Sequence, residues 1–344
     1  MEEGTARPIS VIIPAFNELA YCRACVESVR ANTRRAHTLI LVDNGCTDGT
    51  GEFFDEVPGA VAVHSPENKG FAGGVNLGLA HAEGHVVLLN SDTLAPPGWL
   101  ARLEAALLQR PDTGMIGPVS NCAAGAQQVA GPASAEPAAI AARADALARD
   151  KAGAVRETTR LVGFCLMIRE EVWREVGEFD ERFGIGNYED DDYCTRVRQA
   201  GWKLAIAGDT FIYHHGGRTF AGMGIEGEKF DALMAENRAR YAEKWDVYLP
   251  APGTGEGLAA RCNAQAREAL ARGEKAEAVR LLKEAVAAAP EEARHYNDLG
   301  VVLWQAGSAE VAYKCFQEAL RRAPDDPEVR ENLRAAAAHL GVNE

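Results

Sequence analysis

The sequence predicts an α/β domain with a mostly parallel sheet, followed by a smaller domain built of helices. Two observations carry this prediction. Over residues 9–119, short apolar and β-branched runs alternate with amphipathic segments, which is typical of right-handed βαβ units. After residue 257, apolar and small residues recur with a period of about 34 residues, which is typical of stacked helical repeats. A chain of 344 residues is long enough for two domains.

Four buried strands are expected in the first half of the chain, because four apolar runs each end at polar or turn-forming residues. Pro14 is expected to stop the first of them, and a helix follows over residues 19–31. A glycine-rich loop, residues 68–78, runs into another helix and is suited to holding a phosphate at the helix N-terminus. The four strands are expected at residues 9–13, 38–42, 61–64 and 85–90.

Three of these strands end in polar turns, at residues 14–18, 43–50 and 90–93. The carboxyl ends of parallel strands share one edge of the sheet, so the turns are expected to line a nucleotide-sized crevice. In the last turn, Asp92 follows a buried strand and needs a cation, a hydrogen-bond donor or solvent. A divalent metal that carries a phosphate would satisfy this carboxylate. The alternative is that Asp92 only caps the turn before Pro96.

The remainder of this domain holds two further candidate clusters. The acids Glu189–Asp192 open a predicted helix, and a general base poised in a cleft explains their crowding better than the helix dipole does. His214 and His215 end a predicted strand and are candidate ligands. Residues 120–157, rich in Ala, Gly and Pro, are expected to form a flexible lid or a dispensable insertion. Residues 161–168 are expected to form a buried strand.

Composition narrows the classes of function. A net charge of -14 argues against nucleic acid as the main partner. No apolar run approaches the roughly 18 to 20 residues that span a bilayer, and the acidic first residues do not resemble a secretion signal. Among eight scattered cysteines, Cys22 and Cys25 form a CxxC pair without a second pair at zinc spacing. The cytoplasm is therefore the expected location, with any membrane contact peripheral at the inner face.

Eight short motifs occur in order along residues 8–248, and together they resemble the glycosyltransferases of family 2, which have a GT-A fold. The order and spacing of the set carry the resemblance, since each motif alone is common. The motifs are Pro14–Glu18, Asp43-Asn44-Gly45 with Asp48, Asn68–Phe71, Leu89–Asp92, Gly163–Cys165, Phe179–Glu181, Glu189–Asp192, and His214 with Gly216-Gly217.

The resemblance implies a role for each position. The metal, Mn²⁺ or Mg²⁺, would be held by Asp92 and His214, and Asp190 would be the catalytic base, with Glu189 beside it and Asp191 as the alternative base. Position 90 is Asn where the family's metal motif has its first acid. The nucleotide-sugar donor would be bound by Pro14, Phe16, Asn17, Glu18, Asp43, Asn68, Lys69, Gly70, Asn76, Asn90 and Ser91.

The implied reaction moves a sugar from a UDP- or dTDP-linked donor to an acceptor, which is a protein, a peptide or a surface glycan. The metal would neutralise the diphosphate that leaves. Asp190 would take the proton of the acceptor hydroxyl as it attacks the anomeric carbon. Displacement in one step inverts the configuration at that carbon.

The second domain is expected to be a tetratricopeptide-like repeat over residues 258–344, after a Pro- and Gly-rich linker at residues 249–257. Leu299, Gly300 and Phe316 occupy tetratricopeptide positions in the second copy, and the first copy is degenerate. Two repeats are fewer than the roughly three that a free-standing array needs. The domain is therefore expected to pack on the transferase domain or on a second subunit. Its expected role is to dock a protein or peptide acceptor, and the alternative is dimerisation or structural support.

Two other functions stay open on the sequence. A sugar-phosphate nucleotidyltransferase would have glycines and basic residues directly after the first strand, where this chain has Pro14–Glu18. A non-catalytic scaffold, in which the repeats bind a partner protein, is favoured by Asn90. The acid cluster Glu189–Asp192 and His214 argue for catalysis.

Overall fold

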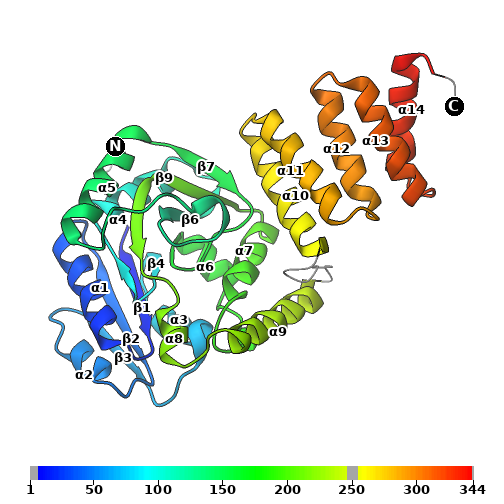
Figure 1. The fold of residues 1–344 in the computed structure, drawn as a ribbon. Coiled ribbons are helices and arrows are strands. Elements are labelled where there is room, and N and C mark those ends of the chain that lie inside the picture. The colour runs from blue at the N-terminus through cyan, green and yellow to red at the C-terminus, as the bar shows by residue number, and fades with distance from the viewer. Residues whose placement is uncertain (1–6, 246–254, 343–344) are drawn as a thin grey trace. The chain divides into compact units, whose positions relative to one another are not determined.

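The computed structural model describes residues 7–245 and 255–342, and the chain divides into two compact units, the first ending at Trp245 (Figure 1). Most of the predicted linker, residues 249–257, lies outside the described residues. Its last three residues, 255–257, belong to helix α10 (Gly255–Ala271) instead of a linker. Each unit is described by itself.

The described part of the first unit is built on a nine-stranded sheet in the order β3-β2-β1-β4-β8-β6-β9-β5, with β7 paired to β9. The four strands expected in the first half pair in parallel. Pro14 lies inside the first strand instead of stopping it, because β4 pairs with that strand only as far as Ile12. These strands are β1 (Ile9–Ala15), β2 (Thr38–Asn44), β3 (Val61–Ser65) and β4 (His85–Leu89).

The other half makes the sheet mixed, where a mostly parallel sheet was expected. β8 (Cys165–Ile168) runs antiparallel to β4 and to β6 (Thr113–Ser120). β9 (Lys203–His214) is parallel to β6 and antiparallel to β7 (Val155–Thr158) and β5 (Thr93–Leu94). The strand expected over residues 161–168 begins only at Cys165, so residues 161–164 are free to turn toward the sheet edge.

Helices cover both faces of the sheet. Alternate residues of β1 explain why its apolar run is continuous: Val11 and Ile13 join one core, Ile12 joins the other, and all three are fully buried. The first core packs under α1 (Leu19–Asn32), α2 (Thr50–Asp55) and α4 (Trp99–Leu108). The second packs under α3 (Gly70–Leu79), α6 (Glu170–Val176) and α7 (Glu189–Gln199). Cys22 and Cys25 are buried thiols of the first core.

Residues 120–157 contain a packed helix, which contradicts the expected flexible lid. Helix α5 (Pro137–Asp150) buries Ile140, Ala144 and Leu147 in the second core. These residues recur at the spacing of one helix face, but alanines around the helix reduce the contrast between its apolar and polar faces. The sequence pattern was therefore too weak to reveal the helix. The unit ends with α8 (Arg218–Gly222) and α9 (Glu228–Trp245).

The described part of the second unit consists of consecutive helices that pack on one another, in agreement with the expected all-helical domain. Leu282, Leu299, Phe316 and Leu333 share its core. A Cβ added at Gly300 would lie 2.5 Å from the Phe316 ring, so this glycine permits the close approach of two helices. After α10 the helices are α11 (Lys275–Ala288), α12 (Ala293–Gln305), α13 (Ala309–Arg322) and α14 (Pro327–Leu340).

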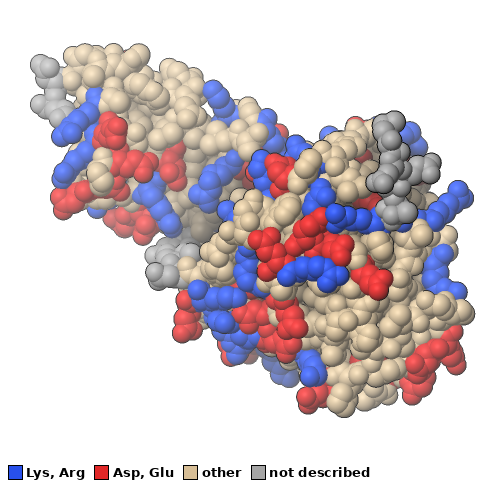
Figure 2. Space-filling view, turned by 180° about the vertical axis from the view of Figure 1, so that it is seen from behind, with Lys and Arg blue, Asp and Glu red and all other residues tan. Residues whose placement is uncertain are grey.

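The charged surface is mixed in sign. Figure 2 shows Lys and Arg side chains interspersed with Asp and Glu over the visible face, instead of one extended basic area. Within the described segments, no helix has both the length and the apolar character that a bilayer crossing requires.

Candidate active site

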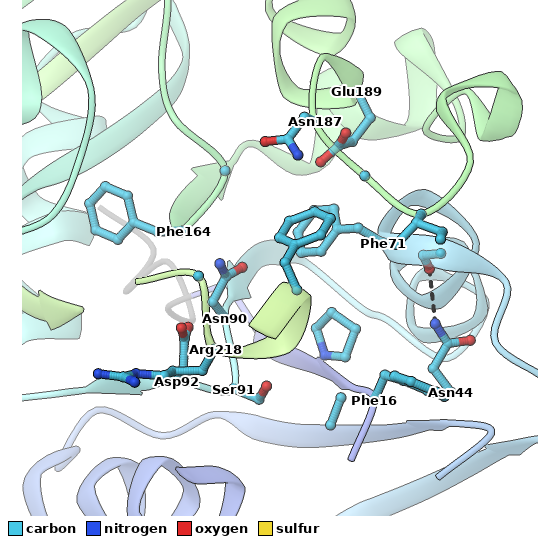
Figure 3. Close-up of a pocket in the computed structure, with 18 of the residues that line it drawn as sticks. Phe16, Asn44, Phe71, Asn90, Ser91, Asp92, Phe164, Asn187, Glu189 and Arg218 are labelled. Atoms are coloured by element: carbon cyan, nitrogen blue, oxygen red, sulfur yellow. Dashed lines mark hydrogen bonds between the residues drawn. The ribbon is translucent and has the colours of Figure 1, made fainter. Parts of the chain in front are cut away.

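A cavity of about 280 Å³ opens at the edge of the sheet where β1, β2 and β4 end (Figure 3). One wall comes from the ends of β1 and β2 and from the turn after β4. The opposite wall comes from the loop before α7 and from the segment around α8. Residues far apart in the sequence therefore meet at the predicted crevice. Ten predicted site residues line it: Pro14, Phe16, Asn68, Gly70, Asn90, Ser91, Asp92, Glu189, Asp190 and His214.

Asp92 and His214 lie together on one side of this cavity. The antiparallel pairing of β5 with β9 places Thr93 opposite His214, which brings the turn after β4 to the end of β9. His214 Nε2 is 3.1 Å from Asp92 Oδ1, and His214 Nδ1 lies 2.8 Å from the Cys122 carbonyl oxygen. Burial alone would raise the pKa of Asp92 and lower the pKa of His214. The contact between the two side chains acts the other way and prevails, so the pKa of Asp92 is lowered and that of His214 is raised.

These two residues fit a divalent metal as an incomplete ligand set. The Cys122 carbonyl can accept a hydrogen bond from the N–H at Nδ1, which would leave Nε2 of His214 as the metal-facing nitrogen. One carboxylate and one imidazole suit Mn²⁺ or Mg²⁺ when other ligands are water or phosphate oxygens. The described residues contain no group of three or more His, Cys, Asp or Glu side chains placed to hold a metal. A substrate diphosphate would have to complete the coordination.

Arg218 lines the same side of the cavity and was missed by the sequence reasoning. Figure 3 shows its side chain beside Asp92. Its guanidinium also lies over the Tyr21 ring, 5.4 Å from the centroid. A cation next to the predicted metal position is suited to a diphosphate. Its place just after Gly216-Gly217 was the one available signal. His215, the second histidine of that motif, packs against Tyr21 and Tyr213 instead of lining the cavity.

The four acids at the start of α7 separate into different environments. Glu189 and Asp190 are buried and line the cavity. Asp191 does not line it and forms an ion pair with Arg160. Asp192 is fully buried and bound by Arg196 at 2.9 Å and by Lys244 at 2.6 Å. The structure thus brings two of the four acids, not all, to the site.

Asp190 is held in a fixed orientation by two backbone donors. Its Oδ2 accepts the N–H of Gly163 at 2.8 Å, and its Oδ1 accepts the N–H of Asp191 at 2.9 Å. Burial and the charge of Asp191 raise the pKa of Asp190 to about 6, while Arg160 acts in the opposite direction. A carboxylate with a pKa near the working pH is well matched to general-base chemistry.

Glu189 differs from its neighbour. Burial, and then the charge of Asp190, raise the pKa of Glu189 well above the ordinary range of a glutamate. We therefore expect Glu189 to stay protonated when Asp190 is ionised. Two adjacent carboxyl groups thus differ in protonation, which is the usual sign that they have different roles.

The opposite end of the cavity is formed by Asn44 and the loop before α3. Asn44 Nδ2 donates to the carbonyl of Gly70 at 2.9 Å and to Asn68 Oδ1 at 3.1 Å. Gly70 adopts φ 72°, and a Cβ there would lie 1.9 Å from the Gly184 carbonyl oxygen. Only glycine fits this position. The predicted loop is therefore a rigid part of the wall.

Six predicted site residues do not line the cavity, Asp191 among them. Asn76 Oδ1 accepts the backbone N–H of Phe179 at 2.8 Å, so its amide joins α3 to a neighbouring segment. Asp43 accepts the N–H of Cys46 at 2.7 Å and contacts His64 at 2.9 Å. Its neighbour Asn44 lines the cavity in its place.

The other three hold the loops that form the cavity edge. Asn17 and Glu18 adopt left-handed backbone, with φ 58° and 63°, at the turn into α1. Asn17 Oδ1 accepts the N–H of Thr47 at 2.8 Å and joins two of the predicted turns. The N–H of Lys69 donates to Asn44 Oδ1 at 3.1 Å. These residues hold the loops in place without lining the cavity. Sequence motifs alone do not distinguish such residues from those that touch a ligand.

An apolar wall was also missed. Phe220 lies 3.4 Å from the position of a Cβ built on Gly186 and packs edge-to-face on Phe230, with ring centroids 5.4 Å apart. Met223 reaches Asn68 across the cavity, with its sulfur 3.6 Å from Asn68 Nδ2. These residues come from α8, α9 and the segment between them, which had no motif in the sequence. Their position follows only from the way this segment folds back over the sheet edge.

Comparison with known protein families gives two matches. The family described as "Glycosyltransferase like family 2" matches residues 6–232, and a tetratricopeptide repeat family matches residues 263–327. The first match covers more than half of the chain, and the second falls within the helical unit.

Similar proteins match about 60% of the chain. An uncharacterized protein of Sinorhizobium fredii is 29% identical over 228 residues, which cover 62% of this chain and 25% of that protein. An N-acetylglucosaminyl-diphospho-decaprenol L-rhamnosyltransferase of Mycobacterium tuberculosis is 25% identical over 237 residues, which cover 60% of this chain and 76% of that protein. The chain thus spans a quarter of the first relative and about three quarters of the second.

Two solved structures share the fold. GalNAc-T7 with UDP, GalNAc and Mn²⁺ superposes with a TM-score of 0.52 and 18% identity, over 70% of this chain and 49% of that one. The mannosyltransferase PcManGT of Pyrobaculum calidifontis, in complex with GDP-Man and Mn²⁺, gives 0.50 and 19%, over 97% of this chain and 87% of that one. At these identities the likeness establishes a common fold.

Proposed function

Because the chain belongs to the glycosyltransferase-like family 2, we propose that it transfers a glycosyl group, with inversion, from a UDP- or dTDP-sugar to an acceptor. The expected GT-A fold and tetratricopeptide repeat are confirmed, and membership of the family supports the proposed glycosyltransferase activity. The observation that carries the finer proposal is one cavity lined by both Asp92 with His214 and the buried carboxylate of Asp190. That pairing supplies a leaving-group end and a base end.

At the leaving-group end, Asp92 and His214 would hold Mn²⁺ or Mg²⁺. The metal would neutralise negative charge that develops on the departing diphosphate. Arg218 lies on the same side and would bind the diphosphate through its guanidinium. The Cys122 carbonyl holds the His214 ring in place through Nδ1. The two solved neighbours are both complexes with Mn²⁺, which supports this assignment.

At the base end, Asp190 would accept the proton of the attacking acceptor hydroxyl. Its two backbone hydrogen bonds fix the carboxylate, and its raised pKa makes the ionised form a stronger base than an exposed aspartate. Arg160 holds Asp191 outside the cavity, so Asp191 would act on Asp190 by its charge and not as the base. One base opposite the leaving group is the arrangement that displacement with inversion needs.

At the nucleoside end, the wall formed by Pro14, Phe16, Asn44 and Asn68 would bind the base and ribose. Phe16 offers an aromatic surface and the two asparagines offer amide groups, which together suit a flat heterocycle with polar edges. Uridine or thymidine is the proposed nucleoside. We propose no direct contact for Asp43, because its carboxylate is engaged by Cys46 and His64.

The acceptor class is the remaining part of the proposal. The mycobacterial relative, whose name describes transfer to a lipid-linked sugar, favours a glycan acceptor. The tetratricopeptide repeat favours a protein or peptide acceptor, or a homodimer, since such repeats are protein-binding surfaces. We propose that the enzyme acts in the cytoplasm on one of these acceptors.

The test is a turnover screen of the full chain with a panel of UDP- and dTDP-sugars and Mn²⁺, with release of the nucleoside diphosphate as the readout. We expect release from one donor class, and loss of release with chelator and in Asp92→Asn. Asp209→Asn is the matched control, because Asp209 is a buried carboxylate outside the cavity that also accepts a backbone N–H. Release that is absent for every donor, or independent of Asp92, would contradict the proposal.

A further inference from the structure

Three residues that line the cavity each carry a buried side-chain polar atom that has no hydrogen-bond partner among the described residues. The atoms are Oδ1 of Asn90, Nδ2 of Asn187 and Oε2 of Glu189. Figure 3 shows Asn187 and Glu189 projecting into the cavity from the wall at α7, and Asn90 from the opposite wall. Buried polar atoms in folded proteins are normally paired, so three unpaired atoms on side chains that line one cavity point to a polar ligand there.

The position of these atoms assigns them to one part of the substrate. Asn90 precedes the metal-site residue Asp92 by two positions, and Glu189 directly precedes the base Asp190. Asn90 therefore lies beside the leaving-group end, and Glu189 lies beside the base end. The glycosyl group that moves must occupy the interval between these two ends during transfer. The nucleoside end, at Asn44 and Asn68, is a separate part of the cavity.

The chemistry of the three atoms matches sugar hydroxyl groups. The amide nitrogen of Asn187 only donates, and the amide oxygen of Asn90 only accepts. The carboxyl group of Glu189 can donate when it is protonated, as its raised pKa favours. A sugar hydroxyl both donates and accepts, so a hydroxylated ring can satisfy all three.

The loop that presents Asn187 is held under strain by a buried anchor. Asn187 and Tyr188 have φ 71° and 74°, a left-handed backbone that is unfavourable for a tyrosine. Asn237 of α9 is fully buried, and its Nδ2 donates to the carbonyls of Phe183 at 2.7 Å and Gly186 at 2.8 Å. Strain that is stabilised in this way is typical of loops that position a functional group.

We propose that Asn187, together with Asn90 and Glu189, hydrogen-bonds hydroxyls of the donor's glycosyl group and so determines which sugar is transferred. Asn237 is a positioning residue for this loop. The proposal rests on the proposed function, and it adds Asn187, which lies outside the motifs found in the sequence.

The test compares Asn187→Gly with the wild-type full chain. Glycine tolerates φ 71°, so this variant removes the amide without backbone strain. Calorimetry with Mn²⁺ measures Kd for a nucleoside diphosphate and for the corresponding nucleotide sugar that wild type binds best. We expect Kd for the nucleoside diphosphate to change less than twofold, and affinity for the nucleotide sugar to fall about 10-fold.

Two further variants complete the test. Asn187→Asp keeps the shape but loses the donor, and the same loss of sugar-dependent affinity is expected. Asn332→Ala, in the second unit, is the control and should change neither Kd. Equal sugar-dependent affinity in wild type and Asn187→Gly would overturn the inference while leaving the proposed function intact. Failure of wild type to bind any nucleotide would instead overturn the proposed function, and this inference with it.

Discussion

Replacing Asp190 with Asn should remove activity and at the same time stabilise the fold at neutral pH. The carboxylate is buried and lies next to Asp191, and both features raise the pKa of Asp190 from 3.8 to about 6. Such an increase corresponds to roughly 3 kcal/mol against the ionised form in the folded protein. Asn is neutral, so the side chain that replaces Asp190 does not carry this free-energy cost. It also loses one of two hydrogen bonds from Gly163 and Asp191, which offsets roughly 1 kcal/mol.

The net expectation at pH 7.5 is a gain of roughly 2 kcal/mol in the free energy of unfolding of the first unit. The sign depends on pH. Between pH 3.8 and about 6 the folded protein binds more protons than the unfolded chain, so the term that destabilises wild type grows over this interval. Below pH 3.8 the carboxyl is protonated in both states and the gain should vanish.

Activity should fall about 10²- to 10⁴-fold in Asp190→Asn, the usual contribution of a general base. In wild type, kcat/KM should fall on the acid side with an apparent pKa near 6, because only the ionised Asp190 can accept a proton. Burial and the charge of Asp191 raise this pKa, and the charge of Arg160 opposes them. The assays are nucleotide release between pH 5 and 8, and urea unfolding at pH 7.5 and 4. Asp209→Asn, the control, should keep activity and gain no stability. Retained activity in Asp190→Asn would contradict the role of Asp190 as the base. A loss of stability that is equal at both pH values would contradict the free-energy cost of its buried charge.

Four further outcomes are expected. Asp191→Asn should shift the acid limb of the pH profile to lower pH, because the Asp191 charge raises the pKa of Asp190; an unchanged limb would exclude this coupling. His214→Ala should abolish the dependence of nucleotide affinity on Mn²⁺ as measured by calorimetry, and a preserved dependence would place the metal elsewhere. Gly70→Ala should destabilise the first unit by more than about 2 kcal/mol in urea unfolding, because its Cβ meets a backbone carbonyl, so near wild-type stability would contradict the loop geometry. Gly300→Ala should destabilise the second unit, followed by Trp304 fluorescence, with nucleotide affinity unchanged; a parallel loss of affinity would show that the two units are coupled.

The strands and the position of the cavity could be predicted because they depend on local pattern. A buried strand such as β4 can be recognised from its continuous apolar run. The position of the strand then places Asp92, which follows it, at the edge of the sheet. The acid cluster that contains Asp190 could be recognised in the same way, because it opens a helix. These features need only a few neighbouring residues to be recognised.

The remaining parts of the site depend on contacts between distant segments. Arg218 and Phe220 reach the cavity because α8 folds back over the sheet edge, and no local pattern encodes that path. Asn76 and Asn187 are both asparagines near predicted loops. The side chain of Asn76 bonds to the backbone of Phe179, whereas Asn187 lines the cavity and its Nδ2 has no partner among the described residues. Only the tertiary structure distinguishes the two.

Titration of the wild-type protein with UDP, dTDP, GDP and CDP, each with and without Mn²⁺, tests the central claim most directly. We expect that UDP or dTDP binds, that Mn²⁺ strengthens this binding at least tenfold, and that His214→Ala removes the effect of Mn²⁺. If folded wild-type protein binds none of the four nucleotides, or binds them equally well with and without Mn²⁺, the assignment of the cavity to a metal-assisted nucleotide-sugar donor is contradicted.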